Sequence, residues 1–400
     1  MTSQHVLVVG GPSFPLDKVD SLGLRYSMVQ IPELVRERDL SGAVRYAVID
    51  YRKIDEVSAI ARAWHGIDPF DAVISFTEYG LYPAARCAAE LGIPGDNVEA
   101  VVLTRDKRKT RDLLDRHGLS PVRHRTCGDV EEARAFLTEL NGAPVVLKPC
   151  DGGLSEGVFI VESEHELAQR WAWTRAATSG PVLVEEFLSG PEYSVEAISI
   201  DGKHEIVMIT EKVTTELPRF VELGHQVPAR LTDPDRARIE ELVIRLLELV
   251  RQKTGPTHTE VRLTPSGPRI IESQTRIGGD QVWELCEMVS GVDLMSEAIA
   301  AMVGLPAPER VPVAQAAAIR FFSYENVRIL AVDNLAAAAQ ARGVVRLECS
   351  LAAGQEYGDL ASSTSRQGYV LCTGATTADA VTNAEAARDL VAVTWEPIAR

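Results

Sequence analysis

The sequence has little of what marks a membrane, extracellular or nucleic-acid-binding protein. Its 6 cysteines include no CxxC pair, so neither a structural zinc site nor a dithiol redox pair is expected. No apolar run approaches the roughly 18 residues of a membrane-spanning helix, and no basic segment followed by an apolar stretch opens the chain. The net charge is −16, whereas nucleic-acid binding needs a basic face. These absences predict a globular, cytoplasmic protein with reduced thiols that binds neither membranes nor nucleic acid.

The glycine motifs of two common nucleotide-binding folds are also missing. Gly10 and Gly11 follow an apolar run, but Pro12 and Pro15 interrupt the helix that a dinucleotide fingerprint would open, so we interpret them as a tight turn. A second glycine-rich stretch, residues 151–157, is followed by no Gly-Lys-Ser/Thr and is not a Walker loop.

A pair of glutamates across a predicted hairpin is the most informative feature that is present. Residues 257–281 read THTEVRLTPSGPRIIESQTRIGGDQ, which places Glu260 and Glu272 on two strands joined by the turn PSGP. Such strands can bring two carboxylates side by side, and Gln274 and Arg276 follow Glu272 at spacings of two. Two carboxylates and an amide oxygen suit magnesium with phosphates, and an arginine can neutralise a phosphoryl group or an oxyanion. A solvated hairpin with ordinary surface charges explains the same pattern equally well.

A second motif upstream favours a phosphate site. Residues 145–161, VVLKPCDGGLSEGVFIV, predict two strands around a glycine-rich loop whose tip can fold over phosphates. Lys148 supplies a positive charge at the start of the loop. The loop residues that we assign to a phosphate site are Gly152, Gly153, Ser155 and Gly157.

Two further predicted strands, VLVEEFL and YSVEAIS, lie between these motifs and are joined by the turn SGPE. The backbone of the first strand offers donors and acceptors to an adenine ring, along Glu185, Glu186, Phe187 and Leu188. Glu192, just past the turn, can accept hydrogen bonds from ribose hydroxyls. A plain hairpin with exposed acids is the alternative.

The chain resembles an ATP-grasp enzyme in three segments and in their order. These are Lys148 with its glycine loop, EEFLSGPEYSVE, and the run from Glu260 to Gly279. The resemblance covers about residues 70–300 and continues more weakly to both ends. Members of this superfamily clamp ATP between two α+β lobes and join a carboxylate to a nucleophile through an acyl-phosphate. EKVTTE (211–216) and FVELGHQVPA (220–229) are similar to the branch that ligates amino acids, including L-amino acid ligases of the bacilysin-synthetase and dapdiamide-synthase type.

The resemblance implies roles for particular residues. It implies Mg²⁺ (or Mn²⁺) on Glu260, Glu272 and Gln274, although the family usually has asparagine at the third position. It places Lys107 on a phosphate of ATP and implies a catalytic role for Arg276 together with Lys148. The implied substrate-binding residues are Glu78, Glu211, His225, Arg276, Gly278 and Gly279. Glu78 ends a predicted strand, where ligand sites lie in such sheets, but capping of the helix that follows is an equal alternative to binding an ammonium group.

The expected fold is mixed α/β and α+β with ATP-grasp architecture. Strands at 5–11, 46–52 and 71–78, with helices at 33–38 and 56–66, predict a parallel N-terminal domain (1–97). An ATP-grasp domain follows at 98–302, with a small lobe at 98–184 and a large lobe at 185–302. Residues 303–400 predict a small β-rich domain in which Arg320, Arg366 and Tyr369 are expected to be exposed rather than to close the site.

The predicted function is ATP-dependent ligation of an amino acid carboxylate to an amine, with release of ADP and phosphate. A ligase that loads an amino acid onto a carrier protein, a carboxylase and a non-catalytic ATP-binding regulator are the alternatives. The regulator would be expected to have lost Glu260, Glu272 or Arg276, and all three are present. ATP and small amino-acid-like substrates are the expected partners, and a homodimer stays open.

Overall fold

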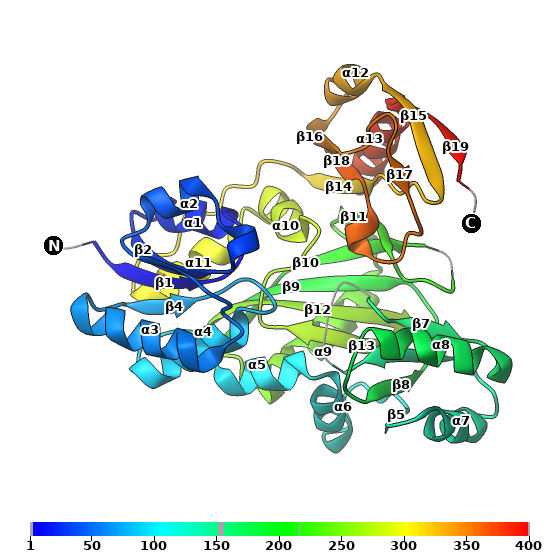
Figure 1. The fold of residues 1–400 in the computed structure, drawn as a ribbon, viewed down its shortest axis with the longest axis horizontal. Coiled ribbons are helices and arrows are strands. Elements are labelled where there is room, and N and C mark those ends of the chain that lie inside the picture. The colour runs from blue at the N-terminus through cyan, green and yellow to red at the C-terminus, as the bar shows by residue number, and fades with distance from the viewer. Residues whose placement is uncertain (1–2, 151–155, 216, 399–400) are drawn as a thin grey trace.

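The computed structural model describes residues 3–150, 156–215 and 217–398 (Figure 1). It begins with a parallel sheet in the order β3-β2-β1-β4, as expected for an α/β domain. Its strands are β1 (His5–Val9), β2 (Arg25–Gln30), β3 (Tyr46–Val48) and β4 (Ala72–Ile74). Its helices are α1 (Phe14–Ser21), the 3₁₀ helix η1 (Pro32–Leu34), α2 (Glu37–Gly42), α3 (Ile54–Ile67) and α4 (Leu81–Leu91).

Two predictions for this region are wrong. A helix, α1, does form after Gly10 and Gly11, because Pro15 lies in its first turn, where a missing N–H costs nothing, and strand β2 beyond it was not predicted. The helix expected at 33–38 is instead split into η1 and α2. Below the sheet, Val6, Val8 and Ile74 pack with Met295 and Ile299 and join this region to the rest of the protein.

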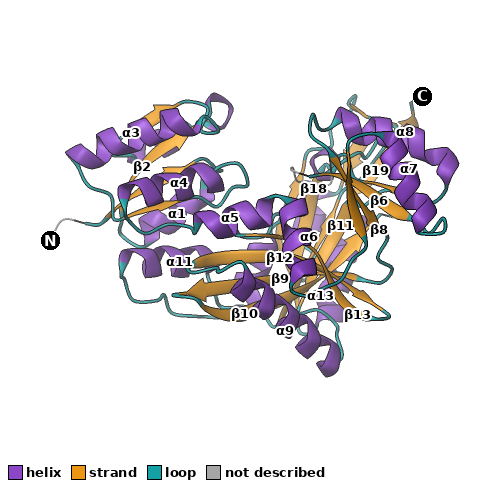
Figure 2. Ribbon diagram, turned by 90° about the horizontal axis from the view of Figure 1, so that it is seen from below, coloured by secondary structure: helices purple, strands orange, loops and turns teal. Residues whose placement is uncertain are grey.

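A second sheet forms the small lobe, which we define as residues 124–186. Its antiparallel order is β5-β8-β6-β7, and helices α7 and α8 cover it (Figure 2). The strands are β5 (His124–Cys127), β6 (Val145–Pro149), β7 (Phe159–Val161) and β8 (Val182–Glu186), and the helices are α7 (Val130–Glu139) and α8 (Glu164–Ala176). Helices α5 (Val98–Arg105) and α6 (Lys107–Arg116) connect the lobe to the N-terminal sheet.

An eight-stranded antiparallel sheet forms the body of the molecule in the order β13-β12-β9-β10-β11-β14-β18-β16. Its first five strands in the chain are β9 (Glu192–Ile200), β10 (Lys203–Thr214), β11 (Glu222–Val227), β12 (Gly255–Thr264) and β13 (Gly267–Gln274). The helices of this part are α9 (Asp233–Leu249), α10 (Val282–Ser290) and α11 (Leu294–Val303). Strands β8 and β9 therefore belong to different sheets, and the SGPE turn between them is not the tip of a hairpin.

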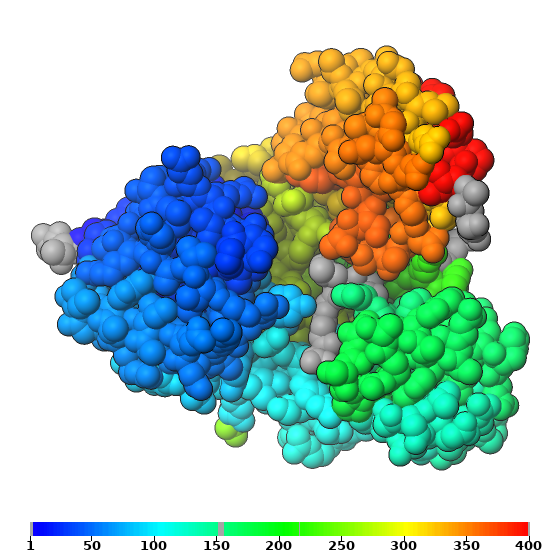
Figure 3. Space-filling model, viewed as in Figure 1, coloured from blue at the N-terminus to red at the C-terminus, as the bar shows by residue number. Residues whose placement is uncertain are grey.

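The C-terminal region continues the large sheet with β14 (Ala316–Phe321), β16 (Val344–Cys349) and β18 (Gly368–Gly374). A small sheet adds β15 (Val327–Asp333), β17 (Glu356–Tyr357) and β19 (Ala392–Pro397), with α12 (Leu335–Ala339), η2 (Ser363–Ser365) and α13 (Thr377–Leu390). Figure 3 shows the N-terminal region, the small lobe and the C-terminal region arranged around a recess. Among the described residues, no helix has the length and apolar character needed to traverse a bilayer.

Candidate active site

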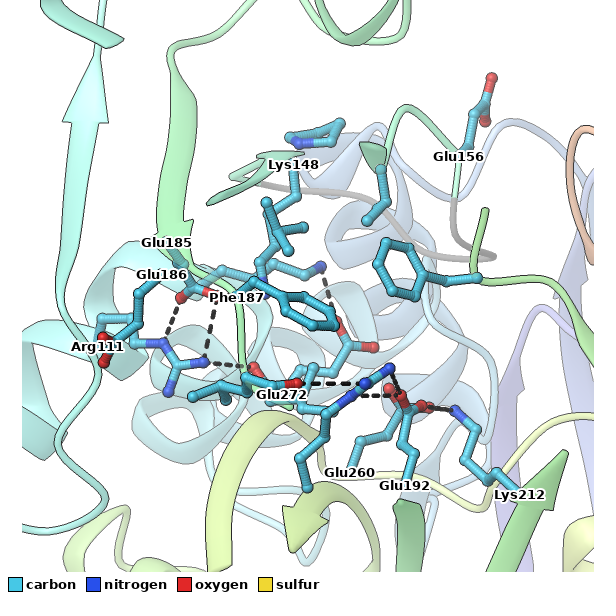
Figure 4. Close-up of a pocket in the computed structure, with 18 of the residues that line it drawn as sticks. Arg111, Lys148, Glu156, Glu185, Glu186, Phe187, Glu192, Lys212, Glu260 and Glu272 are labelled. Carbon is cyan, nitrogen blue, oxygen red and sulfur yellow. Dashed lines mark hydrogen bonds and ion pairs between the residues drawn. The ribbon is translucent and has the colours of Figure 1, made fainter. Parts of the chain in front are cut away.

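The two glutamates of the predicted hairpin lie directly opposite each other. Strands β12 and β13 pair with Glu260 in register with Glu272, and a β-bulge follows at once. Both carboxylates line a pocket between the large sheet and the small lobe (Figure 4). Burial would raise the pKa of Glu272, but Lys107 holds it below its usual value even though Glu260 pushes it upward.

Gln274 completes this group. Its Nε2 donates to Glu272 Oε1 at 2.8 Å, whereas its Oε1 is buried with no hydrogen-bond partner in the described part of the chain. An orphaned buried oxygen beside two carboxylates fits a hard cation such as Mg²⁺. No three His, Cys, Asp or Glu side chains converge as a metal cage within 3–150, 156–215 and 217–398.

Lysines neutralise the carboxylates. Lys107 Nζ lies 3.0 Å from Glu272 Oε2. Lys212, on β10, lies 2.7 Å from Glu192 and 3.4 Å from Glu222, and also pairs with Glu260. Burial alone would lower the pKa of Lys212, yet these three glutamates raise it well above its usual value. The pKa of Lys107 is likewise raised despite burial, by Glu272, so the surrounding carboxylates favour the charged form of both lysines.

Lys212 is a site residue that we did not predict, although it stands inside the EKVTTE motif. The sequence feature that could have indicated Lys212 is its position in a predicted strand, where alternate side chains share one face. In the structure Lys212 pairs with His225 across β10 and β11, so the two side chains lie on the same face of the sheet.

A buried ion cluster forms the floor beneath Lys148. Glu185 pairs with both Lys148 and Arg111, and Arg111 also donates to the carbonyl oxygens of Ile270 (2.7 Å) and Ile271 (3.2 Å). Burial would raise the pKa of Glu185, but Arg111 and Lys148 lower it to about 2. The Arg111 side chain thus links α6 to β8 and β13. Arg111 was missed, although it follows Lys107 by four residues and must share its helix face.

The remaining residues assigned to ATP lie around the same pocket. Glu186, Phe187, Leu188 and Glu192 line it together with Lys148. The ring of Phe187 lies 6.5 Å from that of Phe220, which also lines the pocket and could flank a planar base. Gly157 has φ +71°, and an added Cβ would lie 2.6 Å from Ala177 Cβ. Gly152, Gly153 and Ser155 lie outside the described residues.

Arg276 and Glu78 come together although they are far apart in the sequence. Glu78 accepts from Arg276 Nε and from Arg105 Nε, each at 3.1 Å. Strand β13 ends at Gln274, so Arg276 lies on the following loop and not on the alternating face that we predicted. Gly278 N–H donates to Glu196 at 3.3 Å, and an added Cβ there would lie 2.8 Å from His258 Nδ1.

The two other substrate-binding candidates, His225 and Glu211, lie in different surroundings. His225 Nε2 lies 3.4 Å from Asp280 Oδ2. Asp280 follows Gly279 directly and is four residues from Arg276 in the chain. Glu211 lies on the opposite face of β10 from Lys212 and pairs with Arg230. Arg320 and Tyr369 are buried and the side chain of Arg366 is only 8% exposed, which contradicts the prediction that they are exposed, because each has a polar partner in the structure.

Comparison with known families agrees with this architecture. Residues 17–95 match the ATP-grasp N-terminal domain, residues 141–284 match the ATP-grasp domain and residues 320–396 match the L-amino acid ligase C-terminal domain 2. The chain contains an ATP-grasp domain. Its fold is that of the L-amino acid ligase from Bacillus licheniformis, with a TM-score of 0.83 over 98% of this chain and 99% of that one at 22% identity.

The relatives that the chain matches include a named ligase and a named synthase. Alanine–anticapsin ligase of Bacillus subtilis is 29% identical over 266 residues, which are 60% of this chain and 55% of the relative. Carnosine synthase 1 of Gallus gallus is 28% identical over 377 residues, 86% of this chain and 40% of the relative. The chain spans about half the length of the curated relatives that it matches.

Proposed function

We propose that this protein is an ATP-dependent carboxylate–amine ligase. It joins the carboxylate of one amino acid to the amine of a second amino acid and releases ADP and phosphate. The observation that carries the proposal is the paired Glu260 and Glu272 with the unpartnered oxygen of Gln274, facing Lys107 and Lys212. The names of two relatives, alanine–anticapsin ligase and carnosine synthase 1, support the same chemistry.

The described residues divide the work as follows. Glu260, Glu272 and Gln274 would hold Mg²⁺, which when bound neutralises the phosphate oxygens of ATP. Lys107, Lys148 and Lys212 bind the phosphate chain and keep it in line with the attacking group. Phe187 and Phe220 flank the base, and Glu192 accepts from the ribose.

The reaction proceeds in two displacements. A substrate carboxylate oxygen attacks the γ-phosphorus, the bond to the bridging oxygen breaks, and ADP leaves. The amine of the second substrate then attacks the carbonyl carbon of the acyl-phosphate, the carbon–oxygen bond to phosphate breaks, and the amine loses a proton. Arg276 donates to the oxyanion of the second step, while Glu78 orients Arg276 and an incoming ammonium group.

The test is a screen for ADP release over pairs of amino acids, with mass detection of the amide. Hydroxylamine should trap the activated acid as a hydroxamate, and Lys148→Ala should abolish ATP binding in calorimetry. Pyrophosphate and AMP among the products would contradict the acyl-phosphate route. A hydroxamate formed without any amide from free amino acid pairs would point to a carrier-protein acceptor.

A further inference from the structure

The loop that carries Arg276 has an unfavourable backbone at its far end. Asp280 and Gln281, which join this loop to α10, have φ values of +54° and +62°. Side chains other than glycine rarely adopt this left-handed region, and such residues persist when surrounding contacts hold them. Contacts to Asp280 therefore decide whether the loop keeps its path from Arg276 to α10.

Those contacts come from the C-terminal region. Arg366 donates from Nη1 to Asp280 Oδ2 at 2.8 Å and from Nη2 to Asp280 Oδ1, a two-pronged charge-assisted pair. Its Nε donates to Ser363 O at 2.7 Å, and its guanidinium lies 3.7 Å from the centre of the Phe321 ring. Only 8% of the Arg366 side chain is exposed, so its geometry is fixed on every side.

The same C-terminal segment also reaches the candidate nucleotide pocket. Arg366 Nη1 donates to Glu222 O at 3.1 Å, and Ser363 Oγ donates to the Glu222 carboxylate. Glu222 in turn faces Lys212 at 3.4 Å. Residues 363–366 thus touch both the loop of Arg276 and the charges that surround Glu260.

Other parts of the chain hold the loop near its start. Glu78 binds Arg276 itself, and Glu196 accepts from Gly278 N–H. Asp280 lies beyond these two anchors, where His225 and Arg366 are the partners that the structure gives it. Loss of Arg366 would release the far end of the loop and leave the near anchors intact.

We propose that Arg366 is a positioning residue, which through Asp280 holds the Arg276 loop where Arg276 can reach the acyl group. Amide formation then depends on the contact between the C-terminal region and this loop. The inference rests on the proposed ligase function. It assigns Arg366 no contact with ATP, so nucleotide affinity and turnover should respond differently to its loss.

The experiment compares Arg366→Ala, Arg366→Lys and Asp280→Asn with wild type. Arg310→Ala is the control, because Arg310 likewise forms two-pronged carboxylate pairs, with Glu205 and Glu297, but away from the loop. In Arg366→Ala, kcat should fall about 100-fold, as expected for a misplaced catalytic group, with an unchanged ATP dissociation constant. The kcat of Arg366→Lys and of Asp280→Asn should fall less. Added methylguanidinium should restore part of the kcat of Arg366→Ala and should not affect the other variants.

Hydrogen exchange provides a readout that does not depend on turnover. Amides of residues 276–281 should exchange faster in Arg366→Ala than in wild type and in Arg310→Ala. If the wild type ligates nothing but Arg366→Ala still shows this faster exchange, the proposed function is refuted and the positioning of the loop by Arg366 stands. Unchanged exchange and kcat in Arg366→Ala, or faster exchange throughout residues 316–397 with an equal loss of ATP affinity, would overturn the positioning role.

Discussion

Two groups of charges meet in this protein, and they are built in different ways. The hairpin cluster (Lys107, Glu185, Lys212, Glu260 and Glu272) comes from regular strands and one helix within residues 107–272. The Arg276 cluster (Glu78, His225, Arg276, Asp280 and Arg366) gathers from the N-terminal region, the large sheet and the C-terminal region.

The difference concerns how each cluster is held in place. Backbone pairing fixes the hairpin cluster, since Glu260 and Glu272 share one register position and their lysines are almost fully buried. Four of the five residues of the Arg276 cluster lie outside regular strands and helices and depend on side-chain pairs. We infer that the first cluster holds its shape by itself, while the second forms when three parts of the chain dock.

The largest expected effect tests the rigidity of the hairpin cluster. Arg111→Ala should lower the free energy of unfolding by about 3–5 kcal/mol, because it leaves the buried Glu185 with one partner. Urea unfolding would measure this loss. Arg328→Ala removes a half-exposed pair with Glu356 and should cost at most about 1 kcal/mol. If Arg366→Ala destabilised the protein as much as Arg111→Ala, the contrast between the clusters would fail.

The next effect concerns turnover. Glu272→Gln should reduce kcat about 1,000-fold, several kcal/mol of transition-state stabilisation, because one of two opposed carboxylates is lost. ATP binding should suffer less, since Lys148 and Lys212 remain. Calorimetry with ATP and an ADP-release assay separate the two quantities, and an equal loss in both would mean that Glu272 serves binding alone.

Removal of Arg276 should leave ATP binding intact. Arg276→Ala is expected to lower kcat about 100-fold with a nearly unchanged KM for ATP, the pattern of an interaction made in the transition state. Glu78→Gln and His225→Ala should raise the KM of an amino acid more than that of ATP. If these two variants changed the KM for ATP alone, the Arg276 cluster would belong to the nucleotide.

Acid should weaken the hairpin cluster in a defined pH range. The pKa of Glu185 is lowered to about 2, so its stabilising pairs are complete above its unfolded value near 4.5 and are lost as pH falls toward 2. The stability difference between wild type and Glu185→Gln should therefore be constant above about pH 5 and shrink below it, by up to about 3 kcal/mol. Urea midpoints from pH 6 to pH 2.5 would test this, and a difference that does not depend on pH would contradict it.

The hairpin cluster was largely predictable from the sequence, and the Arg276 cluster was only partly so. A period of two residues and a short turn determine which side chains of β12 and β13 face each other, and so they predict the Glu260–Glu272 pair. The contact between Asp280 and Arg366 spans 86 residues and joins two loops, where no periodicity indicates a partner. Its burial also reverses the usual expectation that a lone arginine in a polar stretch is exposed.

Strand β2 was missed for a related reason. It carries the polar residues Ser27 and Gln30, both buried, so its pattern lacked the apolar run of β1. Ser27 lies 2.9 Å from the His5 ring, and Gln30 donates to Gly11 O, contacts that only the folded sheet supplies. Polar groups that find partners in the tertiary structure mislead a prediction based on hydrophobicity.

The smallest expected effect concerns Gln274. Gln274→Asn restores the side chain that is usual in this family, and asparagine presents the same amide oxygen on an arm one methylene shorter. Because Gln274 Nε2 also donates to Glu272, the variant should lose that bond, at a cost of about 1 kcal/mol and less than tenfold in kcat. Gln274→Leu, which keeps the bulk but offers no oxygen, is the matched control and should lose far more activity, together with Mg²⁺ affinity in an isothermal titration with ADP. If Gln274→Asn were as inactive as Glu272→Gln, the unpartnered oxygen would not serve the metal. If Gln274→Leu kept wild-type activity, the hairpin cluster would work through its two carboxylates and lysines without the amide.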